Sequence, residues 1–584
     1  MEHSPNPEHD LEIFDVILRI ITQKPIESNT TEEITNILTV AYSDRAVMVK
    51  SWIERHIMVG IHLNPNSDFN RQIDQGPHPK SKEAIAFREF WGEKSTLRRF
   101  QDGALLESLE WGEDPFNELT LYALQKHFSS DVKVESAPSD VSPLFQLPGH
   151  QANIPSPLGA YDELVTTLRS LDLTVGITST SPISPFLRNT SVFPYDPLNC
   201  KSPLTTLCPP SIKILVKLES STAWPYELTP LLQYKIAVYI EIAKLLNEKG
   251  IQSKPHYEGV HILLHGFVFD LIAFHEDEMR HFLGSPHGDK VHFTEKVLVI
   301  HHSFISALCT RYPSFSDSVR TSIRWVRSKG VTSEALSQEA IECIVASIYT
   351  SEIIPTNPYT GFLRFLCIFA SKQNVISINS TIPASDTTDL PLVIVAQHCI
   401  HSEFTRNCIL LTKSVVSFLY AAASQSLKIA IDGRFSPTNR NLQRIFAIPT
   451  SHWHVKYFID MKILPHNEFA LFTNKRRIGM FEIKTKIPPE LDALYVDFNP
   501  VLSLLKELYG RFGRILNFWY DELGGFAFGV SYSDELLKSK PLKEDDLNFA
   551  MMTDTGDICV DLDSIKQQIM IMGSNIIKNF EVSE

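Results

Sequence analysis

Three segments in the middle of the chain decide the fold: SIKILVKLE (211–219), PYELTPLLQYKIAVYIEIAKLLNEKG (225–250) and GVHILLHGFVFDLIAF (259–274). The first is short and rich in Ile, Leu and Val, which is typical of a buried strand. The second repeats apolar residues along a long helix and ends on Gly250, a favoured helix terminator. The third continues as strands. This order predicts a sheet with the helix packed across it.

The rest of the chain extends this mixed pattern of helices and strands. Segments rich in Ser, Pro and Gly at 136–160 and 194–211 are expected to be a linker and a long loop. In the first part of the chain we expect a helix over 9–23 with Leu11, Phe14, Ile17 and Ile21 on one face, a strand at 57–63, a short helix at 65–73 and a strand at 104–111. A mainly helical run is expected over 296–350. Near the C-terminal end we expect a hairpin that turns at Gly524 and Gly525, and a closing helix that is capped by Asp563 and aligns Ile565, Ile569 and Met572 on one face.

Composition places the chain among ordinary globular proteins of several domains. It has 584 residues, of which 43% are hydrophobic and 21% charged, and a formal net charge of −14. We expect no membrane span, because no apolar run approaches the ~18 residues required. The eight cysteines stand singly without a C-x-x-C pair, which favours a reduced, intracellular protein. The acidic surface means that any RNA contact must use local basic patches.

The carboxylates do not form the pattern that metal-assisted nucleotidyl transfer requires. That chemistry uses two ions ~3.5–4 Å apart, usually held by an Asp-x-Asp pair on a strand. Asp270 is the acid of the 259–274 segment, but Val268 and Ile272 occupy the same-face positions. The FWGEKSTLRRFQDGALLESLEW block (90–111) offers Glu107 and Glu110 only on opposite faces of a strand. We therefore predict that the chain is not an enzyme and has no catalytic residues and no cofactor.

The histidines between 256 and 302 also lack the spacing of a catalytic zinc site. His261 and His265 are four residues apart in a strand-like run, where they share a face without a third ligand. The sequence therefore predicts no bound metal.

Three basic groups stand out as candidate RNA contacts. The cations of the first group flank Phe90, Trp91 and Phe100, and cations beside exposed aromatic rings suit the binding and base stacking of single-stranded RNA. The alternative is that the aromatic rings belong to the core and that the cations pair with Glu93 and Glu107. The second forms an i, i+4, i+7 stripe, for which an ordinary solvated face is the alternative. The third lies in a short loop that could equally contact RNA, contact protein or do neither. The residues are Lys94, Arg98 and Arg99; Arg320, Arg324 and Arg327; and Lys475, Arg476 and Arg477.

Several stretches together resemble one known family. GIHLNPNSDFNRQIDQGP, FREFWGEKSTLRRFQDGALLESLEW, VKLESSTAWP, RYPSFSDSVRTSIRWVRSKG, GFLRFLCIFA and FNPVLSLLKELYGRFGRILNFWYDELGGFAFGV occur here in order. From about residue 55 to the end, the chain resembles the C-terminal half of the nucleolar RNA-associated protein family (Nrap), a component of the small-subunit processome.

The resemblance implies a multidomain α+β architecture. It comprises a linking α+β domain at 1–145, a degenerate nucleotidyltransferase-like α/β domain at 150–296, a helical domain similar to that of poly(A) polymerases and oligoadenylate synthases at 297–465, and a small α+β module at 466–584.

The resemblance further implies a non-catalytic scaffold for 18S pre-ribosomal RNA processing in the nucleolus. Its partners would be pre-ribosomal RNA or small nucleolar RNA together with other assembly factors, and no small-molecule substrate is expected. Two alternatives remain: an active RNA nucleotidyltransferase with unconventional metal ligands, and a module that binds only proteins.

Overall fold

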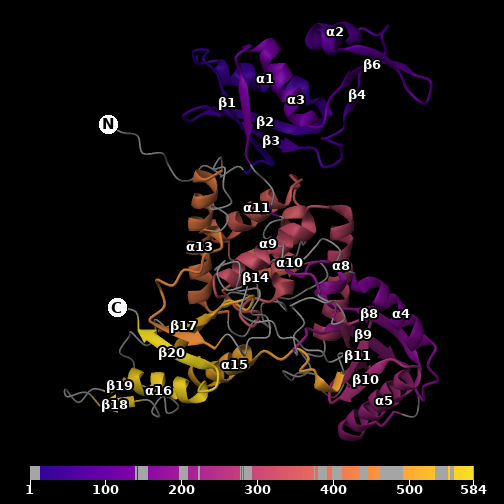
Figure 1. The fold of residues 1–584 in the computed structure, drawn as a ribbon, viewed down its shortest axis with the longest axis vertical. Coiled ribbons are helices and arrows are strands. Elements are labelled where there is room, and N and C mark those ends of the chain that lie inside the picture. Colours follow the sequence, from indigo (N-terminus) through magenta and orange to yellow (C-terminus); the bar gives the residue numbers. More distant parts are fainter. Residues whose placement is uncertain are drawn as a thin grey trace.

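A computed structural model shows the arrangement of the domains (Figure 1). It describes residues 13–137, 141, 156–195, 197, 208–220, 224–275, 278, 281, 293–373, 375–378, 391–396, 411–434, 444–460, 491–513, 515–532, 550–552 and 558–582. The N-terminal domain lies at one end of the long axis, a helical domain lies in the middle, and two domains with sheets lie at the other end (Figure 1).

The N-terminal domain is built on an antiparallel sheet of order β2-β3-β1-β7, with α1 and α3 in the same core. Its elements are β1 Val16–Ile21, α1 Thr30–Tyr42, β2 Ala46–Ile53, β3 Ile57–Leu63, α3 Pro115–His127 and β7 Lys133–Ser136. The strand predicted at 57–63 is confirmed as β3. The helix predicted over 9–23 is wrong, because β1 hydrogen-bonds to β3 and β7 and its Ile- and Val-rich residues suit a central strand.

A three-stranded sheet of order β4-β6-β5 extends from this domain, with α2 beside it (Figure 1). The elements are β4 Ile73–Gln75, α2 Glu83–Trp91, β5 Thr96–Arg99 and β6 Leu105–Glu110. The strand predicted at 104–111 is thereby confirmed. The short helix predicted at 65–73 is wrong: turns fill this stretch, where Asn64 and Asp68 side chains accept hydrogen bonds from backbone groups two residues onward.

The 211–274 region folds as predicted, into a sheet with the long helix packed on one face. The sheet has the order β10-β11-β12-β9-β8, in which only the β9–β12 pair is parallel. Its elements, with α4 and α5 in the core, are α4 Pro157–Arg169, β8 Ile177–Pro182, β9 Ile212–Leu218, α5 Leu228–Glu248, β10 Gln252–His256, β11 Gly259–Leu264 and β12 Phe267–Phe274.

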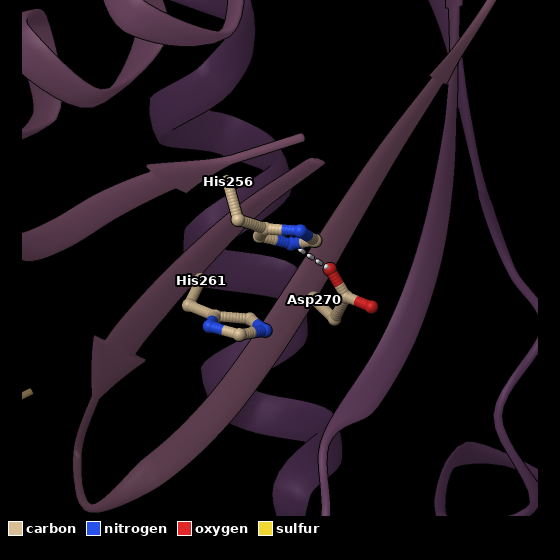
Figure 2. Close-up of side chains that lie close together, drawn as sticks. All are labelled: His256, His261 and Asp270. Atoms are coloured by element: carbon tan, nitrogen blue, oxygen red, sulfur yellow. Dashed lines mark hydrogen bonds and ion pairs between the residues drawn. The ribbon is translucent and has the colours of Figure 1, made fainter. Parts of the chain in front are cut away.

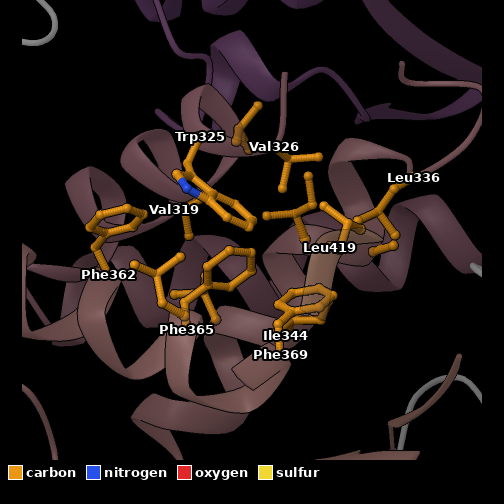
Figure 3. Close-up of a cluster of buried hydrophobic side chains, with 14 of the residues drawn as sticks. Val319, Trp325, Val326, Leu336, Ile344, Phe362, Phe365, Phe369 and Leu419 are labelled. Atoms are coloured by element: carbon orange, nitrogen blue, oxygen red, sulfur yellow. The ribbon is translucent and has the colours of Figure 1, made fainter. Parts of the chain in front are cut away.

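The central domain is mainly helical, as predicted for 296–350. Its elements are α8 Leu298–Arg311, α9 Phe315–Ser328, α10 Gln338–Tyr349, α11 Pro358–Ala370, β13 Val375–Ile378, β14 Val393–Ala396 and α13 Lys413–Asp432. Trp325 lies at the centre of the core, packed against Phe365 and Phe369 (Figure 3). Its indole N–H donates to Ser426 Oγ at 3.0 Å, which satisfies a buried polar group.

Helix α13 corrects the expectation that no apolar run is long enough to span a membrane. By length and composition this helix is long and apolar enough to cross one. However, Leu419, Ala423 and Leu427 are buried in the same core as Trp325. The packing is that of a core helix in a folded domain.

The C-terminal domain combines a sheet of order β16-β17-β15-β20 with two helices. Its elements are β15 Val455–Ile459, α15 Pro500–Phe512, β16 Leu516–Tyr520, β17 Ala527–Tyr532, β18 Ala550–Met552, β19 Ile558–Val560, α16 Leu562–Met572 and β20 Ile577–Val582. The predicted hairpin is β16–β17, and the closing helix is α16. Its N-cap is Asp561, which accepts from Asp563 N and Ser564 N, so the Asp563 assignment is wrong by two residues.

One buried carboxylate joins the nucleotidyltransferase-like region to the helical domain. Glu342 on α10 accepts from Arg188 Nε at 3.0 Å, from Thr190 Oγ1 at 2.6 Å and from Gln338 Nε2 at 3.0 Å, and it pairs with His301 Nε2 at 2.6 Å. Neither the Arg188 nor the Glu342 side chain is exposed. Since the buried charges satisfy each other, losing one partner leaves the other uncompensated.

We predict that Glu342→Ala lowers the free energy of unfolding by about 3–5 kcal/mol, because it leaves the buried Arg188 guanidinium without its charged partner. Glu339→Ala is the matched control, since Glu339 lies on the same helix at 3.4 Å from Arg188 but is partly exposed. Chemical denaturation followed by circular dichroism measures both variants. Equal losses in the two variants would contradict the role given to Glu342.

The same carboxylate predicts an acid-dependent loss of stability. Burial raises the pKa of Glu342, but Arg188 and the hydrogen bond with His301 outweigh it and hold the pKa well below its usual range. A depressed carboxylate pKa contributes stability above the unfolded pKa, about 4.3, and loses it as the pH falls below that value. Denaturation between pH 5.5 and 3.5 should therefore show a steeper loss for the parent than for Glu342→Gln.

Candidate functional site

One face of the β10–β8 sheet carries Asp270, the acid that the sequence offers as a metal ligand in this region. The parallel register pairs Asp270 with Lys213, Ile272 with Leu215, and Phe274 with Lys217. Alternation along the two strands places these six residues on one face, while Ile212, Ile214 and Val216 face the α5 core. Asp270 is thus the only carboxylate among these paired positions, as the sequence predicts.

Apolar residues from two other segments cover much of this face. Ile183, Leu215 and Phe274 are buried together, with Leu298 and Val299 of α8 packed against them. On the other side of Asp270, Val268 is buried with Leu491, and Leu263, Leu494 and Val496 pack around them. Hydrophobic contacts therefore close the face on both sides of its remaining acid, while Lys213 beside that acid is exposed.

Asp270 itself lies beside two histidines, His261 on the adjacent strand β11 and His256 at the end of β10 (Figure 2). His256 Nε2 is 3.0 Å from Asp270 Oδ1, and the His256 and His261 ring centroids are 4.3 Å apart. One potential ligand atom from each of the three residues lies within 4.8 Å of the others. Burial and then the neighbouring His256 lower the pKa of His261, which favours its neutral form.

The expectation that His261 and His265 share a face without a third ligand is wrong. His265 lies in the turn between β11 and β12 with a φ of 52°, and its Nε2 is 2.8 Å from Glu163. The partners of His261 are instead His256 and Asp270. The register of the two hairpins could have identified this group, since His261 directly opposes Asp270.

The first basic group is only partly on the surface. Arg98 and Arg99 are exposed on β5, and Arg98 lies 3.7 Å from Glu110. Lys94 is half-buried with its Nζ 4.9 Å from the Trp111 ring centroid. Two of the three aromatic residues belong to the core: Trp91 is buried, and the Phe90 ring stacks on His127 with centroids 4.3 Å apart. Phe100 is half-buried. The idea that the Phe90 and Trp91 rings are exposed for base stacking is therefore wrong, while Arg98 and Arg99 as RNA contacts stay a prediction.

The arginine stripe of α9 is not a surface. Arg324 is buried and its Nη1 is 3.0 Å from Asp521 Oδ2; Arg327 is buried and its Nε is 3.3 Å from Glu522 Oε2. Arg320 is mostly covered, bonded to Asp317 at 2.8 Å and to the Val192 carbonyl. The prediction of a phosphate-tracking stripe is wrong, because helices and the β16–β17 hairpin surround α9 and its arginines serve as buried connections between domains.

The third basic group, Lys475, Arg476 and Arg477, lies outside the described residues. It stays a prediction from the sequence.

Comparisons with known proteins agree with this architecture. Four family models match in order: Nrap protein domain 3 over residues 7–129, Nrap protein nucleotidyltransferase domain 4 over 141–285, Nrap protein PAP/OAS1-like domain 5 over 312–408 and Nrap protein domain 6 over 451–580. The fold class is therefore that of a nucleotidyltransferase-like domain followed by a helical PAP/OAS1-like domain. The chain belongs to the Nrap family.

Curated relatives and solved structures are similar at a greater distance. Nucleolar protein 6 of Xenopus laevis is 24% identical over 90% of this chain and 51% of that protein, and nucleolar protein 6 of Homo sapiens is 22% identical over the same shares. The chain thus spans about half the length of the curated relatives it matches. A Cid1 poly(U) polymerase structure matches 50% of this chain and 93% of its own length with a TM-score of 0.33 and 10% identity.

We predict that Arg324→Ala lowers the free energy of unfolding by about 3–5 kcal/mol, because Asp521 is left buried and unpaired. Arg311→Ala, a change of the same kind at an exposed position of α8, should cost less than about 1 kcal/mol. Thermal and chemical denaturation of the three proteins measures the difference. A parent-like stability of Arg324→Ala would mean that the stripe is a surface after all.

Proposed function

We propose that this chain is a non-catalytic RNA- and protein-binding scaffold of ribosome assembly in the nucleolus. Within that role we assign it to the small-subunit processome, where 18S pre-ribosomal RNA is processed and small nucleolar ribonucleoproteins associate. Its partners are pre-ribosomal RNA or small nucleolar RNA and other assembly factors. The nucleolar setting rests on the family and on the name of the curated relatives.

The observation that carries the proposal is that Asp270 is the single carboxylate among the paired positions of β9 and β12. Transfer of a nucleotide through two metal ions needs several carboxylates that bridge and clamp the ions. Among the paired positions of β9 and β12, lysine, leucine, isoleucine and phenylalanine surround a single aspartate. Leu298 and Val299 of α8 further pack on the Leu215 and Phe274 end of this face.

RNA binding would then use local basic patches on an acidic protein. Arg98 and Arg99 stand side by side in sequence on an exposed strand, so their side chains project to opposite faces of β5. The net charge of −14 disfavours RNA over the rest of the surface and leaves it for protein partners.

An RNA nucleotidyltransferase with unconventional ligands is the second candidate. The retained Asp270 with two imidazoles beside it is the observation in its favour. Imidazole nitrogen, however, is a poor ligand for Mg²⁺, which binds oxygen ligands. A protein-only module is the third candidate.

We predict that the purified chain incorporates no nucleotide into RNA primers with Mg²⁺ or Mn²⁺, because the paired positions of β9 and β12 supply a single carboxylate. Labelled nucleoside triphosphates and denaturing gels measure this, with an active poly(U) polymerase as the positive control. Incorporation that disappears in Asp270→Ala would establish the nucleotidyltransferase instead.

We predict that replacing Arg98 and Arg99 by Glu weakens single-stranded RNA binding and lowers the slope of log K against log salt by about 0.7 for each phosphate contact removed. Lys94 is left unchanged because its ammonium packs over Trp111. Lys244→Glu with Lys249→Glu removes the same charge from exposed positions at the end of α5 and is the matched control.

Fluorescence anisotropy over a range of salt concentrations separates the outcomes. An equal effect of the two double variants would assign the loss to net charge alone. The same exchange at Lys475, Arg476 and Arg477 tests the loop independently. If the parent chain binds no RNA at low salt, the protein-only module is correct.

A further inference from the structure

The group formed by His256, His261 and Asp270 comes from three successive strands. His261 on β11 directly opposes Asp270 on β12, and His256 ends β10 opposite Gly259. The three side chains therefore converge on one side of the sheet, and their rings and carboxylate face one another (Figure 2). An ion held by all three would cross-link β10, β11 and β12.

Glycine at position 259 leaves the space in which they meet. A Cβ on that residue would lie 3.1 Å from Asp270 Oδ1, 3.2 Å from His256 Nε2 and 2.3 Å from the Leu271 carbonyl oxygen. The separation from the Leu271 carbonyl oxygen is too short for a side chain without displacement of the backbone, and the other two would require Asp270 and His256 to shift slightly. The site therefore depends on a residue without a side chain directly beside two of its three potential ligands.

The donor atoms define the kind of ion. Two imidazole nitrogens and one carboxylate oxygen suit Zn²⁺ and related divalent transition metals, whereas Mg²⁺ and Ca²⁺ take oxygen ligands. Three protein ligands are also the number that leaves a coordination position for water.

The distances are compatible with capture of such an ion after small movements. Ligand atoms about 2.0–2.1 Å from a tetrahedral zinc lie about 3.3 Å from one another. The three atoms here are already within 4.8 Å, and the His256–Asp270 pair is at 3.0 Å. His256 has 31% of its side chain exposed, so rotation of this ring can close the remaining gap.

The surroundings carry both signs of charge. Asp497 lies within electrostatic reach of His261, but its carboxylate accepts from the Ser211 backbone N–H at 2.7 Å and from the Ser211 hydroxyl. Lys254 is also near His261, and its Nζ is 3.0 Å from Asp492 Oδ1. Asp497 adds negative charge near the site, while Asp492 offsets the charge of Lys254.

We propose that His256, His261 and Asp270 bind a divalent transition metal of the zinc class, which pins the β10–β11–β12 hairpins together. This site differs from the carboxylate site of nucleotidyl transfer in its ligands and in its ion. It does not depend on the proposed scaffold role, since an ion here would stabilise the sheet with or without bound RNA.

The test uses the full chain, stripped with a chelator and titrated with Zn²⁺ against a chromophoric competitor. Asp270→Asn keeps the size of the side chain, and His261→Ala removes one imidazole. The matched control is His265→Ala, a histidine of the same sheet that pairs with Glu163 outside the group. Circular dichroism of the metal-free proteins establishes that each variant is folded.

We expect the parent and His265→Ala each to bind one equivalent of Zn²⁺. Asp270→Asn and His261→Ala should lose this binding. The affinity loss should be at least about 100-fold, because even residues that only orient a metal ligand contribute 10–100-fold. Zn²⁺ should raise the Tm of the parent and of His265→Ala, and should leave the Tm of the two ligand variants unchanged. Co²⁺ should give the parent a visible absorption spectrum of nitrogen and oxygen ligation.

Equal zinc stoichiometry and affinity in the parent and both ligand variants would overturn the proposal, since the ion would then lie elsewhere. The proposal would also be overturned if the parent protein failed to take Zn²⁺ from the chromophoric competitor. If a ligand variant is unfolded, the stoichiometry and the Co²⁺ spectrum of the parent still decide the matter.

Discussion

The buried ion pair between Arg188 and Glu342 is the constraint on which the arrangement of the two central domains depends. Arg188 follows β8 of the nucleotidyltransferase-like sheet and also donates from Nη1 to the Ile183 carbonyl at 2.8 Å. Glu342 belongs to α10 of the helical domain. Because neither charge can reach water, the two domains are joined at this point by a contact that cannot be loosened without a large cost.

The closure of the sheet face follows from this contact. Ile183, held by Arg188, belongs to the apolar cluster that includes Leu215, Phe274 and two residues of α8. At this end of the face, Leu215 and Phe274 are therefore used for packing between the two domains.

The sequence predicts the elements that depend on local pattern. The strand–helix–strand unit was predictable because its apolar runs are long and end on clear turn residues. Strand β1 was not, because Leu11, Phe14, Ile17 and Ile21 also fit a helix and only the pairing with β3 and β7 decides between them. The α9 arginines were misjudged because spacing identifies a stripe without telling what covers it, and the partners Asp521 and Glu522 lie almost 200 residues away. The His256, His261 and Asp270 group requires the register of three strands, which no spacing rule supplies.

Ultraviolet crosslinking of the protein to RNA in cell extract, with the crosslinked peptides identified by mass spectrometry, tests the scaffold account most directly. The account predicts crosslinks in peptides that contain residues 94–99 or 475–477, and none in the strands of the closed face, 212–218 and 267–274. Crosslinks concentrated on those two strands would show that the face is open and holds RNA as an enzyme would. Complete absence of crosslinks would equally contradict an RNA scaffold.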